Sequence, residues 1–130
     1  MEAFEGDGEI KAANGITIAD GIAVKMPRDG VKALRAIKKT NGHALVVSDE
    51  EILDAVRLLS SKAGIFVEPS AAATLAGLRK SLEVKVLTKD EKIVLLLTGH
   101  GLKAPEAAIG TMKATLIEPD ISELREKELV

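Results

Sequence analysis

The sequence predicts an α/β domain with a partly parallel sheet flanked by helices. Short aliphatic runs alternate along the chain with stretches whose apolar residues recur at helical spacing. The run 93–97 has no polar alternation, so both of its faces should be covered, as in the central strand of a parallel sheet. The 130 residues, 46% apolar and 29% charged, have the size and composition of one globular domain. We therefore expect a single domain over 1–130.

Residues 1–30 are predicted to form an irregular N-terminal segment. Its glycines and Pro27 favour loops and extended backbone over helices. From Asp29 the pattern becomes helical, since the apolar residues at 31, 34 and 37 fall on one face, and Asn41 and Gly42 should end this helix. The opposite face carries the cations Lys32, Arg35, Lys38 and Lys39. They can attract an anionic partner, but solvent exposure alone explains them.

A strand and a capped helix follow. The run 43–47 is short, apolar and rich in Val, which predicts a buried strand. Ser48 and Glu51 are spaced as a capping box, in which each side chain accepts a hydrogen bond from the other residue's backbone N–H. A helix is therefore predicted from Asp49, with Gly64 placed to terminate it.

Residues 65–67 predict a second short strand, which ends at Pro69 because the residue before a proline is driven out of the helical region. A second helix is predicted from Ser70. Its first half is built largely from small residues, namely Ala71, Ala72, Ala73, Ala76 and Gly77. This composition favours a close approach of the helix to a sheet or to another helix.

Two more strands are predicted, at 84–88 and at 93–98. Beyond them the pattern predicts a short helix after Pro105, a strand at 115–117, a turn at Pro119 and a last helix at 121–129, the final part forming a charged tail at 118–130. In α/β sheets, ligands bind at the carboxyl ends of the strands. The polar segments 68–70 and 98–101 follow predicted strands, so they are the candidate sites.

Composition and charge argue against several classes of function. The chain has 18 basic and 20 acidic residues, a formal net charge of −2, so no nucleic-acid or membrane surface is indicated. Aromatic residues make up 2% of the chain and Cys is absent, which rules out base-stacking platforms, disulfides and thiolate metal sites. The longest aliphatic run is much shorter than a membrane helix, and the acidic N-terminus does not resemble a signal peptide. We expect a cytoplasmic protein.

Thr98, Gly99, His100 and Gly101 form the first candidate site. The hydroxyl can bond a ligand heteroatom, the glycines let backbone N–H groups approach a ligand, and the imidazole can carry a proton. The alternative is a tight turn in which His100 only bonds nearby carbonyls, and the residues alone favour this turn.

Glu68 and Ser70 form the second candidate site. Glu68 can point into a cleft beside the helix N-terminus, whose backbone N–H groups attract anions. The alternative, which the residues alone favour, is that Ser70 caps the helix and Glu68 is solvated. His43 is interpreted as structural, because the chain has two His and neither stands at metal-ligand spacing from another ligand. We predict no metal site and assign no catalytic residue.

Four motifs together resemble the threonine synthases. They are TIADGIAV at 17–24, SDEEI at 48–52, GIFVEPSAAA at 64–73 and LTGHGLK at 97–103. The last distinguishes threonine synthases from threonine dehydratases, which usually carry a Ser-Gly-Gly-Asn type sequence there. The resemblance covers nearly the whole chain, but only the last third of the enzyme.

The resemblance implies a fold, a cofactor and a reaction. Threonine synthases are pyridoxal-phosphate enzymes of the tryptophan synthase β-like fold, and they convert O-phosphohomoserine and water to threonine and phosphate. The Thr of the last motif, here Thr98 followed by Gly99, would bond the pyridine nitrogen of the cofactor. The backbone at Ala19 and Gly21 would lie beside the cofactor ring. These four residues are the expected cofactor-binding positions, either vestigial or dependent on a partner.

The resemblance also shows what these residues lack. The Schiff-base Lys segment and the glycine-rich phosphate loop of the family have no counterpart here, so we expect the chain alone to be inactive and not to hold pyridoxal phosphate. The expected partner is the N-terminal half of a threonine synthase, or further copies of this chain. One alternative is a non-enzymatic dimerising or small-ligand-binding module that reuses the fold. Another is an independent small enzyme that uses His100 and Glu68.

Overall fold

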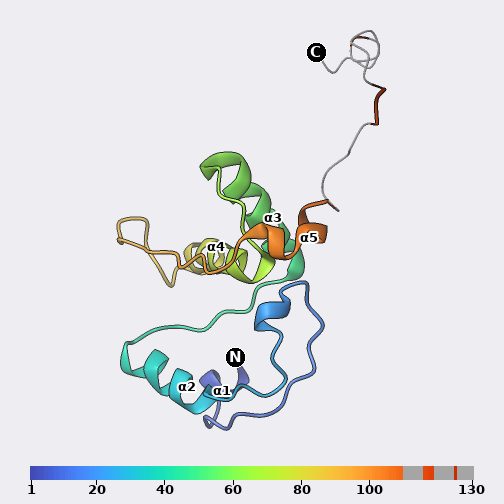
Figure 1. Cartoon of the computed structure of the whole chain (residues 1–130). Helices are drawn as coiled ribbons and strands as arrows, with labels where there is room; N and C mark the ends of the chain where they lie inside the picture. Colours follow the sequence, from blue (N-terminus) through green and yellow to red (C-terminus); the bar gives the residue numbers. More distant parts are fainter. Residues whose placement is uncertain (110–115, 119–124, 126–130) are drawn as a thin grey trace.

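The computed structural model describes residues 1–109, 116–118 and 125. The described elements are, in chain order, α1 (Glu2–Glu5), η1 (Asp20–Ile22), α2 (Gly30–Lys39), α3 (Asp49–Leu58), η2 (Leu59–Ala63), α4 (Pro69–Glu83), η3 (Gly101–Lys103) and α5 (Pro105–Ile109). Helices α3, α4 and α5 lie together, while α1 and α2 form a separate group that an extended segment connects to α3 (Figure 1). No helix in these ranges is long and apolar enough to cross a membrane.

Helix α3 begins and ends as the sequence predicts. The Ser48 N–H donates to Glu51 Oε2 at 2.6 Å, and the Glu51 N–H donates to Ser48 Oγ at 3.2 Å, which completes the capping box. The helix continues into one π-helical turn, η2, and Gly64 follows in the left-handed conformation with φ of 66°. This φ favours glycine because a side chain would be strained there.

Glu51 also connects α3 to α4, because its carboxylate lies 3.3 Å from Lys80 Nζ. The hydrogen bond from the Ser48 backbone, followed by the contacts with Lys80, lowers the pKa of Glu51 below its ordinary value of 4.5. The folded state therefore favours the ionised carboxylate. This contribution to stability is fully present above the ordinary pKa and is lost as the pH falls through the lower pKa of the folded state.

Replacing Glu51 by Gln should therefore destabilise the chain near neutral pH, and the difference from wild type should shrink on acidification. Urea unfolding between neutral pH and the acid range measures this difference. The matched control is Glu50→Gln, at an exposed position in the same helical turn. A difference for Glu51→Gln that stays constant through the acid range would contradict the argument.

The core forms where α3 packs on α4. Its buried residues are Ala19, Ile52, Ala55, Val56, Leu59, Val67, Ala71, Ala72 and Ala76. The small side chains of α4 allow the two helices to approach closely, with the larger side chains of α3 filling the space between them. Helix α4 begins at Pro69, one residue before the predicted start, since proline is well suited to the first helical position.

The predicted parallel sheet is not confirmed. In the described part of the chain there is no strand, and the β-pairing consists of one isolated antiparallel bridge between Val67 and His100. The segments 42–48 and 92–98 carry no helix or turn, but they have no ladder partner among these residues. An aliphatic run indicates that its faces should be covered, whereas a strand also requires a neighbour that supplies hydrogen bonds.

The prediction of a strand at 84–88 is wrong, because this segment begins with the C-terminal turn of α4. Lys85 adopts a positive φ of 58°, and its N–H donates to the Leu82 carbonyl at 3.2 Å. The Val86 N–H donates to the Ser81 carbonyl at 2.9 Å. Together these two bonds form a Schellman motif, which satisfies the last carbonyls of the helix.

The N-terminal segment is mostly irregular, as predicted, but α1 was not expected. Helix α2 matches its predicted range and has no fully buried residue. The first residues of the chain lie against it, since a Cβ added to Gly8 would contact Leu34 at 3.6 Å. Phe4 meets the His43 ring edge-on with 6.4 Å between centroids, which agrees with a structural role for that histidine. The turn predicted at Pro119 and the helix predicted at 121–129 fall almost entirely outside the described residues.

Candidate functional site

Two candidate segments meet at the bridge between Val67 and His100. The Glu68 N–H donates to the Gly99 carbonyl at 3.1 Å, and the Gly101 N–H donates to the Phe66 carbonyl at 3.1 Å. These backbone bonds hold 98–101 beside 66–68. The two segments that the sequence identified separately therefore form one site.

The glycines of this loop are required by close packing. A Cβ on Gly99 would overlap the Glu68 carboxylate, and a Cβ on Gly101 would lie 2.5 Å from atoms of the Phe66 ring. The phenyl ring also meets the His100 imidazole edge-on, with 5.8 Å between their centroids. The absence of side chains at 99 and 101 is what lets the loop lie on this segment.

Glu68 is a buried, paired carboxylate. Its residue is 9% exposed, and its Oε2 lies 3.0 Å from Nζ of Lys103 in η3. The prediction that Glu68 is solvated is therefore wrong. A buried carboxylate needs a compensating charge or hydrogen bonds, and Lys103 supplies that charge from the far end of the same loop.

Ser70 does not cap α4 as the sequence suggested. Glu68 is the N-cap residue and Pro69 occupies the first helical position, so Ser70 lies inside the first turn. Its Oγ is buried and has no hydrogen-bond partner among the described residues. A Cβ added to Gly21 would lie 2.8 Å from this oxygen, so the backbone of Gly21 packs directly on Ser70.

The segment that contains Ala19 and Gly21 is anchored to the start of α3. The Thr17 hydroxyl donates to Asp49 Oδ1 at 2.5 Å, and the Ile18 N–H donates to Asp49 Oδ2 at 3.2 Å. Ala19 is fully buried in the core. The first turn of α4 therefore has Gly99 packed on Glu68 and Gly21 packed on Ser70, which places two of the predicted cofactor positions against one helix end.

Thr98 and His100 have different surroundings in this loop. Thr98 is exposed and makes no hydrogen bond to another described residue. His100 Nδ1 accepts a hydrogen bond from the Leu102 N–H at 3.1 Å, so a neutral ring carries its proton on Nε2. This bond gives His100 the structural role of N-cap for η3, with a backbone N–H as partner instead of the expected carbonyl. Where the structure is described, no three His, Asp or Glu side chains gather to hold a metal ion.

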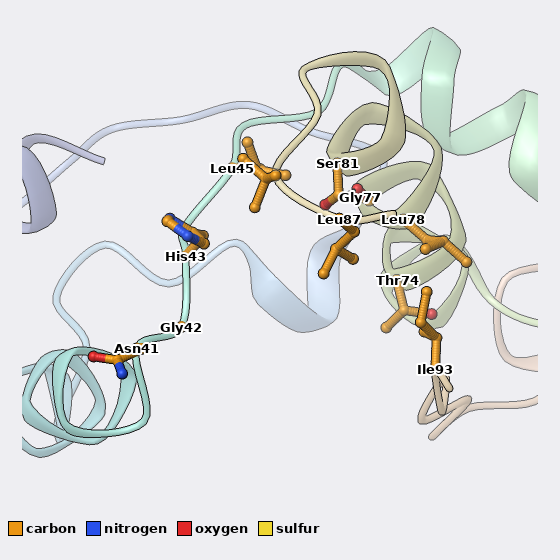
Figure 2. A pocket seen from close by; sticks show the side chains of 11 residues that line it. Asn41, Gly42, His43, Leu45, Thr74, Gly77, Leu78, Ser81, Leu87 and Ile93 are labelled. Carbon is orange, nitrogen blue, oxygen red and sulfur yellow. Dashed lines mark hydrogen bonds between the residues drawn. The ribbon is translucent and has the colours of Figure 1, made fainter. Parts of the chain in front are cut away.

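A cavity of about 420 Å³ lies apart from this site, between the segment 41–45 and α4 (Figure 2). His43 and Leu45 line one side, while Thr74 and Ser81 line the other. The Thr74 and Ser81 hydroxyls donate to carbonyls of their own helix, at 2.8 and 2.7 Å. The cavity therefore presents mainly apolar surface, and none of the predicted cofactor-binding residues lines it.

Sequence reasoning missed three residues that hold the site together: Thr17, Asp49 and Lys103. Thr17 lies 32 positions from Asp49, and Lys103 lies 35 positions from Glu68, with no local pattern to link either pair. The available signal was that all of them lie within the motifs quoted above. The motifs indicated candidate segments without indicating the contacts between them.

Comparison with known proteins agrees with the motifs. The sequence pattern of a family described as "Pyridoxal-phosphate dependent enzyme" matches residues 3–99. The threonine synthase of Methanocaldococcus jannaschii is 47% identical over 128 residues, which are 96% of this chain and 32% of that protein. The threonine synthase of Methanosarcina acetivorans is 41% identical over 85% of this chain, and that of Bacillus sp. (strain ULM1) is 35% identical over 97%.

The chain spans about a third of the length of these curated relatives, with shares of 32%, 27% and 38%. The resemblance to threonine synthases that the motifs indicated is thus confirmed over most of the chain.

Proposed function

Because the chain belongs to the pyridoxal-phosphate dependent enzymes, we propose that it is the C-terminal part of a threonine synthase-like enzyme. The reaction would convert O-phosphohomoserine and water to threonine and phosphate, in a cytoplasmic setting. The structural observation that most supports this proposal is that two expected cofactor-binding positions lie at one helix end. Gly21 packs on Ser70 and Gly99 packs on Glu68, both at the start of α4. The similarity to three threonine synthases supports the same reaction.

The residues present fit one edge of the cofactor. The Thr98 hydroxyl is exposed and free of hydrogen bonds to described residues, so it can bond a pyridine nitrogen. Gly99 and Gly21 pack on the side chains of Glu68 and Ser70, which holds both loop segments at the N-terminal end of α4. When bound, pyridoxal phosphate supplies an electron sink for carbanionic chemistry. A neutral Thr98 hydroxyl would leave the ring nitrogen largely unprotonated and so moderate that sink.

Thr98 and its neighbours would not hold the cofactor by themselves. One neutral hydrogen bond contributes about 0.5–1.5 kcal/mol, far less than a tightly held cofactor needs. Lys103, the lysine of the loop, is paired with Glu68. We expect the Schiff-base Lys and the phosphate loop to come from the remaining two-thirds of the enzyme, and the chain alone to be inactive.

A second candidate is a non-enzymatic module that dimerises or binds a small apolar ligand. The cavity beside α4 and several exposed aliphatic side chains favour it. Such a module would not depend on Thr98, because Thr98 does not line the cavity. A substitution at this position therefore separates the two functions.

Mixing this chain with the unmatched two-thirds of the M. jannaschii threonine synthase and pyridoxal phosphate should restore phosphate release from O-phosphohomoserine. Thr98→Ala should slow the release by about 3- to 10-fold, which corresponds to the loss of one hydrogen bond. Phosphate release and the visible absorbance of protein-bound cofactor are the measurements.

The matched control for this substitution is Thr40→Ala, at an exposed position after α2, which should leave the rate unchanged. Cofactor absorbance and phosphate release absent from every such mixture would refute the proposed function.

A further inference from the structure

We propose that the outer face of segment 93–98 is the docking surface for the remaining two-thirds of the enzyme. The side chains of this segment alternate between two environments. Leu95 and Leu97 are half-buried, and Leu97 packs against the core. Val94 and Leu96, which point the other way, are 83% and 71% exposed. One face is covered by this chain and the other is bare and aliphatic.

The backbone of this segment is also unpaired. None of the N–H or carbonyl groups of 92–98 is hydrogen-bonded to another described residue. An extended segment with free backbone groups is a template for strand addition, in which a neighbouring strand supplies the missing bonds. The segment therefore offers both main-chain hydrogen bonds and an apolar face to a partner.

Two other extended segments also carry an exposed aliphatic side chain. Val46 is exposed within 42–48, and Ile65 is exposed just before the bridged residue Val67. Single exposed aliphatic side chains are ordinary, whereas two on the same face of an extended segment, as at Val94 and Leu96, make a larger apolar surface of the kind that marks interaction sites. Each of the three segments thus carries an aliphatic side chain that the described residues leave uncovered, and segment 93–98 carries two, Val94 and Leu96.

The identity of the docking partner is inferred from the greater length of the related threonine synthases. This inference therefore rests on the proposed function. The family pattern continues to residue 99 and so includes the whole segment. The chain spans 32% of the M. jannaschii protein, which leaves about twice its own length to supply the missing layer. We therefore assign the surface to the remaining part of a threonine synthase, on the same or another polypeptide, in preference to a second copy of this chain.

The test is the association of this chain with the unmatched two-thirds of the M. jannaschii enzyme, measured by sedimentation velocity without substrate. The double variant V94E/L96E should bind at least about 100-fold more weakly, because it places two charges in an apolar contact. The control V31E/V84E adds the same charges at exposed valines on α2 and after α4, and should change binding by less than about 3-fold.

Far-UV circular dichroism establishes that the variants are folded, and V94S/L96S replaces the glutamate pair if they are not. Equal binding of wild type and V94E/L96E would overturn the proposal, as would the absence of any association. Self-association of the chain alone that V94E/L96E abolishes would assign the surface to a second copy instead. A complex that forms through this surface but shows neither cofactor absorbance nor phosphate release would refute the proposed function and leave the docking surface standing.

Discussion

Replacing Gly99 by Ala is expected to destabilise the chain by about 1–3 kcal/mol, as is typical of overpacking. The new Cβ would overlap the Glu68 carboxylate, which is buried and paired with Lys103. Either the carboxylate leaves Lys103, or the backbone bond from Glu68 to the Gly99 carbonyl breaks. Urea unfolding measures the loss, and hydrogen exchange of the Glu68 amide shows whether that bond is affected.

A double-mutant cycle tests the cause. In a Glu68→Ala background the overlapping atoms are gone, so Gly99→Ala should cost less than half as much as in wild type. The matched control is Gly77→Ala in α4, where a Cβ meets no atom within 4 Å. It should stabilise the helix by about 0.5–1 kcal/mol, because alanine is the better helix former. Equal costs in the two backgrounds would show that Glu68 is not the obstacle.

Replacing Ile52 by Ala should cost about 2–5 kcal/mol, the largest loss of stability that we expect. Ile52 is 2% exposed and lies on the face of α3 that packs against α4. The neighbouring side chains on α4 are mostly alanines, which are too short to fill the resulting cavity. Thermal or urea unfolding measures the effect.

Ile16→Ala provides the matched control, since it is the same substitution at a fully exposed position. It should change stability by less than about 0.5 kcal/mol. Similar losses at the two positions would mean that the interface between α3 and α4 is not the main core.

The helices could be predicted because their signals are local. Ser48 and Glu51 are three residues apart, and the capping box they predict is present. Gly64 terminates the same helix with the expected positive φ. These features depend on neighbouring residues, so the sequence contains all the information needed to find them.

The sheet could not be established from the same sequence, because strand pairing is non-local. The run 93–97 predicts two covered faces, but one of them needs a layer that the described residues do not supply. The Schellman turn at Lys85 escaped prediction because a lysine rarely adopts a positive φ. Ser70 was predicted as the N-cap but lies two positions further into the helix, because Glu68 is the N-cap and Pro69 occupies the first helical position.

For the candidate site, the motifs predicted which segments to consider and gave no indication of the contacts between them. Gly99 packs on Glu68, and Gly21 packs on Ser70. The ion pair of Glu68 with Lys103 joins residues whose charges have many other conceivable partners along the chain. Only the folded backbone selects among them.

The first turn of α3 makes two connections through its carboxylates. Asp49 holds the segment that carries Ala19 and Gly21, while Glu51 in the same turn holds Lys80 of α4. Unwinding of that one turn would break both connections at once, since each uses a carboxylate positioned there. Local opening of this kind is a cooperative event, so the two segments should open and close together. The capping box thus couples the segment of Ala19 and Gly21 to Lys80 of α4, although neither contacts the other through these bonds.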